Sequence, residues 1–322
     1  MSLKENISRR VIKAGLRLSF KLPSLLPLPI AALRIGMEQG AQLFPVRKDV
    51  HIEQISLGGI RTERLSTAQK TDAASSTVIL HFHGGAFMAG SPKTHRAMGA
   101  EFAARANAVV YMLDYRLAPE HAYPAALDDG LAAYQALLAQ GYAPQHIVFG
   151  GDSGGCAHIL NLAMALREKG LPLPAALVLI SPYIDITLST GSVTTFKARD
   201  PMVTAHALHR GSEGYRGAIP AGDARVSPLF ADLHGLPPML VQAGGEEILL
   251  DDALRLLERG RAAGVSVDCR IYEGMWHNFQ MFSHYLETAD RAIDEISYFV
   301  RQYTAEAAPR IHGVARAARG TK

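Results

Sequence analysis

The feature that most constrains the fold of this chain is the alternation of short apolar runs with helical patterns from residue 48 onward. The apolar runs lack the polar alternation of half-exposed strands, so they fit strands that are buried on both faces. Strands of this kind, separated by helices, form a parallel sheet with helices on both sides, and we therefore predict an α/β protein. The predicted strands are residues 76–82, 108–114, 146–150, 176–180, 238–243 and 267–272, and the predicted helices are residues 94–106, 125–140, 153–169, 250–263 and 284–303.

Three further segments depart from this rhythm. Residues 50–65 alternate like two paired strands around Gly58-Gly59, which predicts a hairpin. Residues 187–225 are rich in Gly, Ser, Thr and His with weak periodicity, and we expect an insertion that forms a lid above the sheet edge. The segment beyond residue 305 is rich in Ala, Gly and Arg, and we expect it to be a disordered tail.

Two helices are predicted in the first 45 residues, near 5–21 and 28–42. The first is amphipathic, and such a helix packs against a protein core or lies on a membrane surface; we favour packing. This region loosely mimics a secretory signal, but charges continue to Lys21 and no small-residue cleavage site follows, so we expect no signal peptide. The first helix interleaves the apolar residues Ile7, Val11, Ile12, Leu16, Leu18 and Phe20 with the basic residues Arg9, Arg10, Lys13 and Arg17.

The composition excludes several classes of protein. With 322 residues, 48% of them hydrophobic and 20% charged, the chain is neither disordered, nor a coiled coil, nor collagen-like. The net charge is only +3 and no basic face is visible, so we expect no nucleic-acid partner. No apolar run reaches the roughly 18–20 residues that span a bilayer. The two cysteines, Cys156 and Cys269, make no disulfide framework, and we predict a cytoplasmic location.

The sequence Gly-Asp-Ser-Gly-Gly at 151–155 is the strongest chemical signal. It follows the apolar run 146–149 and opens a helical pattern, which is the strand–turn–helix setting of a G-x-S-x-G nucleophile. Such a turn is strained and needs small neighbours, and it presents the serine Oγ above the sheet at a helix N-terminus. We predict that Ser153 is the nucleophile; the alternative is a tight glycine turn with a capping serine.

A second glycine-rich loop follows the first predicted strand. The sequence His-Gly-Gly-Ala-Phe at 83–87 lets backbone N–H groups approach a ligand closely, and a tetrahedral intermediate needs such donors at its oxyanion. We predict an oxyanion hole made of the N–H groups of Gly84, Gly85 and Gly154, with His83 as a brace. His81, His83 and His95 could also suggest a metal site, but no Asp, Glu or Cys stands at ligand spacing, and we expect no metal.

The base and its acid are expected on later loops. His277 follows the predicted strand 267–272, at the edge of the sheet where a hydrolase base belongs, and we predict that it is the general base. The chain order serine, acid, histidine places the acid after strand 238–243. Four carboxylates stand there, and the residue pattern does not choose among them: Glu246, Glu247, Asp251 and Asp252.

Together these motifs resemble the hormone-sensitive-lipase family of α/β-hydrolase esterases, especially its bacterial members. The resemblance covers roughly residues 45–303, and several motifs in the right order make it specific. The residues that carry it are His83-Gly84-Gly85-Ala86-Phe87, Tyr115-Arg116-Leu117-Ala118-Pro119-Glu120 with Tyr123-Pro124-Ala125-Ala126, Gly151-Asp152-Ser153-Gly154-Gly155, Ser181-Pro182-Tyr183-Ile184-Asp185, Glu247-Ile248-Leu249-Leu250-Asp251-Asp252 and Gly274-Met275-Trp276-His277.

The resemblance implies an α/β-hydrolase fold with a mostly parallel central sheet and a helical cap. Residues 1–45 would form the first part of the cap and 187–225 the second. The core would comprise 46–186 and 226–304, the latter carrying the acid and the histidine, and 305–322 would be the tail. The resemblance also implies hydrolysis of short- to medium-chain carboxylic esters without a cofactor. The partner would be a small-molecule ester, and a homodimer is left open.

The resemblance also bears on the acid and on three departures from the family pattern. The family has an Asp-Pro-Leu-x-Asp or Glu-x-Leu-Leu-Asp-Asp segment, and this alignment puts Glu247 at the triad position, ahead of Glu246. Ala86 replaces the usual third glycine, and Gly154 replaces a usual alanine; both keep their N–H groups. Cys156 stands where glycine is common. Its thiol could be acidified at the helix N-terminus, but we favour a packing role.

The sequence thus predicts a serine carboxylesterase that works through an acyl-enzyme, with Ser153, Glu247 and His277 as its triad. An amidase or a lactonase with the same triad is the alternative within enzymes, because the three reactions share this geometry. A non-catalytic ligand-binding protein on the same fold is the alternative from another class.

Overall fold

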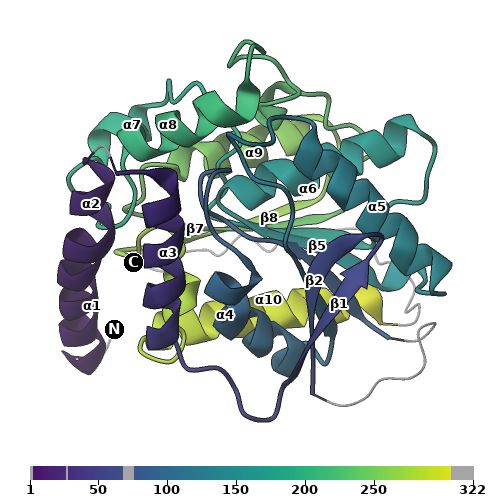
Figure 1. Ribbon diagram of the computed structural model, residues 1–322, viewed down its shortest axis with the longest axis horizontal. Coiled ribbons are helices and arrows are strands. Elements are labelled where there is room, and N and C mark those ends of the chain that lie inside the picture. Colours follow the sequence, from purple (N-terminus) through teal and green to yellow (C-terminus); the bar gives the residue numbers. More distant parts are fainter. Residues whose placement is uncertain (1–2, 27, 68–75, 306–322) are drawn as a thin grey trace, which may run out of the picture.

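The computed structural model describes residues 3–26, 28–67 and 76–305 of the chain (Figure 1). Within these residues one sheet of eight strands has the order β1-β2-β4-β3-β5-β6-β7-β8. Strand β2 pairs antiparallel with both of its neighbours, β1 and β4, and all the other neighbouring strands are parallel. The strands are β1 (His51–Leu57), β2 (Ile60–Ser66), β3 (Val78–Phe82), β4 (Val109–Leu113), β5 (Ile147–Asp152), β6 (Ala176–Ile180), β7 (Met239–Gly244) and β8 (Val267–Tyr272).

Helices cover both faces of the sheet, as Figure 1 shows for α4 and α10 on one side and α5, α6 and α9 on the other. The predicted α/β fold with its mostly parallel sheet is therefore confirmed. These helices are α4 (Pro92–Arg105), α5 (Ala125–Ala139), α6 (Gly154–Glu168), α9 (Leu250–Ala262) and α10 (Glu287–Thr304), and short helical turns lie at Pro144–His146, Pro228–Phe230 and Phe279–Phe282.

Strand β5 shows why the strand sequences are unbroken apolar runs. Ile147 and Phe149 are fully buried in the cluster under α5 and α6, whereas Val148 is fully buried in the separate cluster under α4 and α10. Successive side chains of a strand point to opposite faces, so a sheet that is covered on both sides needs apolar residues at every position. Because β3, β5, β6, β7 and β8 are parallel, the loops after them meet at one edge, where sites of open α/β sheets form.

The N-terminal segment forms helices that lie beside the core at the purple end of Figure 1. Helix α1 (Leu3–Leu16) continues through a π-helical turn (Arg17–Lys21) into the short α2 (Leu22–Ser24), and α3 (Ile30–Gly40) ends in a turn at Ala41–Leu43. The expected packing of the first helix holds for only part of its apolar residues. Ile12, Leu16 and Phe20 face the cluster around Trp276, whereas Ile7, Val11 and Leu18 are exposed.

The segment after β6 forms the helices α7 (Gly191–Thr195) and α8 (Ala205–Arg216). The ammonium group of Lys21 donates to the carbonyl oxygens of Lys197 and Asp200, and Ser24 and Thr204 share a hydrogen bond of 3.0 Å, so this segment contacts α2. The division of the chain into a core and two cap segments stays a prediction. The expected tail lies outside the described residues from 306 onward.

Helix α6 carries a buried histidine that makes stability depend on pH. His158 is packed among the rings of Phe82, Phe87, Tyr115 and Tyr215, and burial lowers its pKa to about 3. The folded protein therefore keeps this imidazole neutral at pH values where an unfolded chain would protonate it. The stability that its neutral form contributes is complete above the unfolded pKa of about 6.5 and is lost as the pH falls toward the folded pKa.

Replacing His158 with Phe should make unfolding less sensitive to acid. Between about pH 6.5 and pH 4, the free energy of unfolding of the wild type should fall more steeply than that of His158→Phe, by about 1.4 kcal/mol per pH unit. Urea unfolding at a series of pH values measures this difference. His206→Phe, a change of an exposed histidine on α8, is the control and should leave the slope as it is. Equal slopes for wild type and His158→Phe would contradict the prediction.

Candidate active site

Ser153 stands on a sharp turn between β5 and α6. Its backbone angles are φ 52° and ψ −123°, an unusual conformation for a residue with a side chain that costs about 1–3 kcal/mol. The turn is held by hydrogen bonds from the Ser153 N–H to the Ile180 carbonyl (2.9 Å) and from the Tyr183 N–H to the Ser153 carbonyl (3.1 Å). A Cβ atom on Gly155 would lie 2.0 Å from the Phe82 carbonyl oxygen, so only glycine fits behind the turn.

The glycine-rich loop after β3 lies against this turn. The N–H of Gly84 donates to Oδ1 of Asp152 over 3.0 Å. Within the described chain, the N–H groups of Gly85 and Gly154 donate to no protein acceptor. Gly154 is also the first residue of α6, where the helix dipole favours negative charge. Gly85 and Gly154 therefore offer two free donors, and Gly84 can serve an oxyanion only by sharing or releasing Asp152.

Side chains on several elements brace this loop. Nδ1 of His83 bonds the Gly84 carbonyl at 2.8 Å, and burial lowers the pKa of His83 to about 3, so its ring is a neutral brace. The ring of Phe87 stacks on Tyr215 of α8 with 4.1 Å between centroids. A Cβ atom on Gly211 of α8 would lie 2.0 Å from the Ala86 carbonyl oxygen. Helix α8 thus touches the loop directly.

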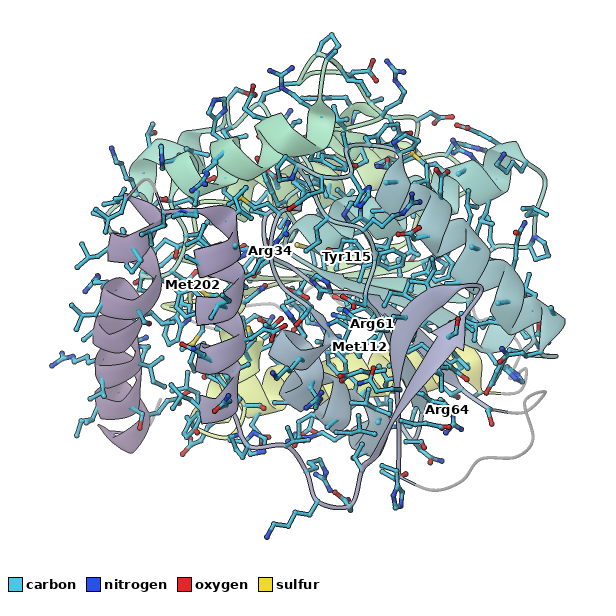
Figure 2. The ribbon with its side chains drawn as sticks, in the orientation of Figure 1. Arg34, Arg61, Arg64, Met112, Tyr115 and Met202 are labelled. Atoms are coloured by element: carbon cyan, nitrogen blue, oxygen red, sulfur yellow. The ribbon has the colours of Figure 1, made fainter. Side chains whose placement is uncertain are left out.

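Helix α3 is tied to the same region by one arginine. Arg34 reaches from α3 toward the side of the core where Tyr115 lies (Figure 2). Its guanidinium donates to the carbonyl oxygens of Met88 (2.8 Å) and Ala118 (3.0 Å) and to both carboxylate oxygens of Glu120 (2.9 and 2.7 Å). A planar guanidinium that donates several hydrogen bonds at once fixes both the position and the orientation of the groups that it binds.

His277 and Glu247 meet on the loops after β8 and β7. Nδ1 of His277 and Oε2 of Glu247 are 3.9 Å apart, which is longer than a hydrogen bond. Oε2 already accepts the hydroxyl of Ser181 (2.7 Å) and the N–H of Gly244 (3.2 Å). Nδ1 of His277 and Oε1 of Glu247 are both buried and bond no other group among the described residues. These are the two atoms that a histidine–carboxylate hydrogen bond of a triad would join.

The buried setting also decides how this pair titrates. Burial lowers the pKa of His277 to about 4, against a smaller opposing effect of the Asp152 charge. The imidazole is therefore neutral near pH 7 and can accept a proton. Burial raises the pKa of Glu247 to about 8, although the hydrogen bond from Ser181 acts in the opposite direction. Charge on either group is costly here, so a proton gained by His277 favours the ionised form of Glu247.

The other three candidate acids are engaged elsewhere. Glu246 pairs with Lys13 of α1 at 2.6 Å. Asp251 and Asp252 accept backbone N–H groups from the segment that follows β6. Of the four carboxylates that the sequence offered, Glu247 is therefore the one that the structure brings next to His277.

Asp152 has a role in the site that sequence reasoning missed. Its fully buried carboxylate accepts the Gly84 N–H (3.0 Å) and the amide of Asn278 (2.6 Å), and it contacts Nε2 of His81 (3.1 Å) and of His95 (3.2 Å). Burial by itself would raise the pKa of Asp152, but the charge of His95 and hydrogen bonds from both histidines hold it well below its usual range. Two of the three histidines weighed as metal ligands, His81 and His95, thus contact a carboxylate.

Ser181, at the end of β6, was also missed as a site residue. Its hydroxyl donates to Oε2 of Glu247 and accepts the N–H of Asn278 (3.0 Å), so it joins the acid to the loop of His277. Its position directly after the buried strand β6 was the sequence feature that could have marked it as a site residue. Cys156 is fully buried, and burial raises the pKa of its thiol well above the usual value, so it is the packing residue that we favoured.

Comparisons with known proteins identify the family of this chain. The alpha/beta hydrolase fold family matches residues 79–281. An esterase of Acinetobacter venetianus is 43% identical over 285 residues, 88% of this chain and 93% of that protein. An acetyl-hydrolase of Streptomyces hygroscopicus is 39% identical over 228 residues, 71% of this chain and 76% of that protein.

Comparison with solved structures identifies a more specific group of esterases. The crystal structure of an esterase from the bacterial hormone-sensitive lipase family superposes with a TM-score of 0.86 at 37% identity, over 95% of this chain and 99% of the other. The esterase EstE5, in a crystal soaked with p-nitrophenyl butyrate, gives 0.85 at 35%, over 93% and 99%.

These matches define an α/β hydrolase, and the chain belongs, within that family, to the bacterial hormone-sensitive-lipase esterases. The predicted family, fold and enzyme class, a carboxylic ester hydrolase, are confirmed. Among the described residues, no helix combines the length and the apolar character needed to cross a membrane.

Replacing Asp152 with Asn should lower both stability and turnover. The amide nitrogen would face groups that now donate to a carboxylate, and each buried donor left unpaired costs about 1–3 kcal/mol. We expect a lower melting temperature, and turnover of p-nitrophenyl butyrate that is lower by roughly 10-fold to 100-fold because three loops lose a shared partner. Asp49→Asn, at an exposed position, is the control. Wild-type turnover and melting in Asp152→Asn would contradict this assignment.

Proposed function

We propose that this protein is a serine carboxylesterase that hydrolyses short- to medium-chain carboxylic esters through an acyl-enzyme. Ser153 is the nucleophile, His277 the general base and acid, and Glu247 the residue that orients the imidazole. The observation that carries the proposal is that two buried atoms without a hydrogen-bond partner, Nδ1 of His277 and Oε1 of Glu247, belong to neighbouring side chains on loops at the same sheet edge as the strained Ser153 turn. The histidine–carboxylate distance of 3.9 Å fits a resting site, because catalytic hydrogen bonds tighten when substrate binds.

The reaction proceeds in two proton-balanced halves. In the first, Nε2 of His277 takes the hydroxyl proton of Ser153 while Oγ attacks the ester carbonyl carbon, and the same proton then goes to the leaving alcohol. In the second, His277 takes a proton from water, the hydroxide attacks the acyl-enzyme, and the proton returns to Oγ of Ser153 as the carboxylic acid leaves. Glu247 stabilises the imidazolium in both halves, and its ionised form is favoured while His277 carries the proton.

The oxyanion of both tetrahedral intermediates is held by backbone N–H groups. Gly85 and Gly154 are the main donors, since no other described group accepts their hydrogen atoms. Gly84 remains in the proposal as a third donor that shares its hydrogen atom between Asp152 and the oxyanion. Each such donor contributes about 3–4 kcal/mol to the stability of the transition state. The helix dipole of α6 acts on the same charge.

The preference for short to medium acyl chains is supported by the relatives. One relative is described as an acetyl-hydrolase, and the crystal of EstE5 was soaked with p-nitrophenyl butyrate. Both acyl groups are short. A butyrate ester is therefore the first substrate to test, and matched lactone and anilide substrates distinguish the esterase from a lactonase or an amidase with the same triad.

Ser153→Ala should abolish the activity. Without Oγ no acyl-enzyme forms, so we expect hydrolysis of p-nitrophenyl butyrate to fall by roughly a thousandfold or more, together with loss of labelling by a fluorophosphonate. The wild type should prefer the butyrate ester over the matched lactone and anilide. Ser189→Ala, at an exposed serine, is the control and should keep both activity and labelling. Near-wild-type turnover by Ser153→Ala would end the proposal, and an anilide or lactone preference would reassign the substrate class.

The two neighbouring glutamates provide a matched test of the triad acid. Glu247→Gln should lower kcat by roughly 100-fold to 10,000-fold, because the imidazolium loses its carboxylate partner. Glu246→Gln removes only the ion pair with Lys13, which is partly exposed, and should change kcat by less than about twofold. Steady-state kinetics on p-nitrophenyl butyrate measure both. A larger loss in Glu246→Gln than in Glu247→Gln would transfer the role to Glu246.

A further inference from the structure

Helix α1 and its continuation through the π-helical turn into α2 expose a row of aliphatic side chains. Ile7, Val11, Leu18, Leu22 and Leu25 are each between 53% and 68% exposed. Spacings of three, four and seven residues place side chains on one face of a helix, so these five form one stripe. We call it the outer stripe. A soluble helix ordinarily turns such a face toward the core, and contiguous exposed apolar surface marks an interaction site.

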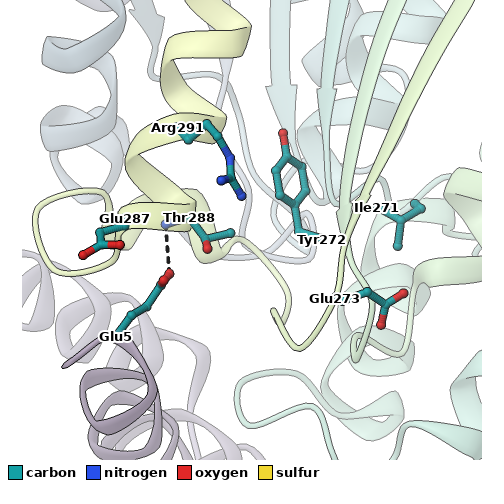
Figure 3. Close-up of a pocket in the computed structure, with 7 residues that line it drawn as sticks. All are labelled: Glu5, Ile271, Tyr272, Glu273, Glu287, Thr288 and Arg291. Atoms are coloured by element: carbon teal, nitrogen blue, oxygen red, sulfur yellow. Dashed lines mark hydrogen bonds between the residues drawn. The ribbon is translucent and has the colours of Figure 1, made fainter. Parts of the chain in front are cut away.

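The outer stripe faces outward because the opposite face of the helix is anchored. The buried carboxylate of Glu5 accepts the N–H of Thr288 at 2.9 Å, at the first turn of α10, beside a surface cavity of about 350 Å³ (Figure 3). Lys13 pairs with Glu246 at 2.6 Å, and its ammonium lies 5.6 Å from the ring centre of Trp276. The helix therefore cannot rotate its stripe inward without breaking these contacts.

The charges beside the outer stripe are positive. Arg10 and Arg17, the exposed charged residues of the helix within the described part of the chain, are both basic, whereas Glu5 is buried. The segment whose carbonyl groups bind Lys21 adds two more exposed basic residues, Lys197 and Arg199. A second copy docked through the same face would bring these cations against one another. An aliphatic stripe flanked by cations instead complements a membrane surface that carries anionic headgroups.

We propose that the outer stripe docks this protein onto an anionic lipid surface. The five aliphatic side chains enter the boundary between headgroups and acyl chains, and Arg10 and Arg17 contact the lipid phosphates. The anchored face of the same helix packs through Leu16 on the cluster that holds Trp276, the neighbour of His277. A docked molecule therefore holds its candidate site directly behind the helix that touches the lipid.

Vesicle binding by the full chain tests this proposal. The assay measures binding and not hydrolysis, so its result is independent of the proposed function. The wild type should co-sediment with vesicles of equal parts phosphatidylcholine and phosphatidylglycerol, more weakly at high salt, and should leave pure phosphatidylcholine vesicles largely unbound. The double variant Val11→Gln, Leu18→Gln and the double variant Arg10→Glu, Arg17→Glu should each bind the anionic vesicles roughly tenfold less tightly or worse.

Matched variants away from the stripe control for general effects. Leu254→Gln changes an exposed leucine of α9, and Lys169→Glu reverses an exposed charge just after α6; both should bind vesicles like the wild type. Circular dichroism and thermal melting establish that each variant is folded. No binding of the wild type to anionic vesicles would overturn the proposal. Equal binding by the stripe variants would overturn it too, as would a stripe variant that changes only the oligomeric state, which would assign the face to a second copy.

Discussion

The carboxylate of Asp152 joins three of the four loops from which the candidate site is built. Asp152 is the last residue of β5, so it directly precedes the turn that presents Ser153. Its oxygens accept hydrogen atoms from the loop of Gly84 and from Asn278, the residue after His277. A buried anion demands partners, because an unpaired charge in an apolar interior is costly. The hydrogen bonds to Asp152 therefore set the distances between these loops. The parallel strands place the loops at the same end of the sheet, where Asp152 can contact them.

The sequence predicted those parts of the fold and site that depend on local pattern. The unbroken apolar runs of β5 and β6 required a sheet covered on both faces, and the turn around Ser153 follows from a glycine-flanked serine between a strand and a helix. Local pattern did not identify Glu247 as the triad acid, because four carboxylates follow β7. Only the family alignment favoured Glu247. The roles of Asp152 and Ser181 depend on contacts between residues distant in the chain, such as Ser181 with Asn278, which no local pattern reports. The orientation of α1 was equally hidden, because both of its faces carry apolar residues.

Helix α1 links the loop of His277 to an exposed aliphatic surface, a connection that no local sequence pattern reports. Its inner side meets the loop of His277 through Lys13 and Leu16, and its outer side carries aliphatic residues among cations. Ordinary globular packing accounts for the first side alone. Exposed aliphatic side chains on the outer side are favourable only when a partner covers them. The positive charges beside them favour an anionic partner. The same helix thus contacts the loop of His277 on one side and carries the proposed lipid-binding surface on the other.

The contact between α8 and the glycine-rich loop after β3 has a consequence for how such an enzyme can evolve. Phe87 stacks on Tyr215, and Gly211 lets the helix backbone meet Ala86 with no side chain between them. Under the proposed function, a substitution that shifts α8 would also displace the backbone N–H groups that we propose as oxyanion donors. Changes in substrate selectivity and in catalytic rate would then arise together. A lineage that adapts to a bulkier substrate must re-tune its catalytic geometry in the same mutational steps.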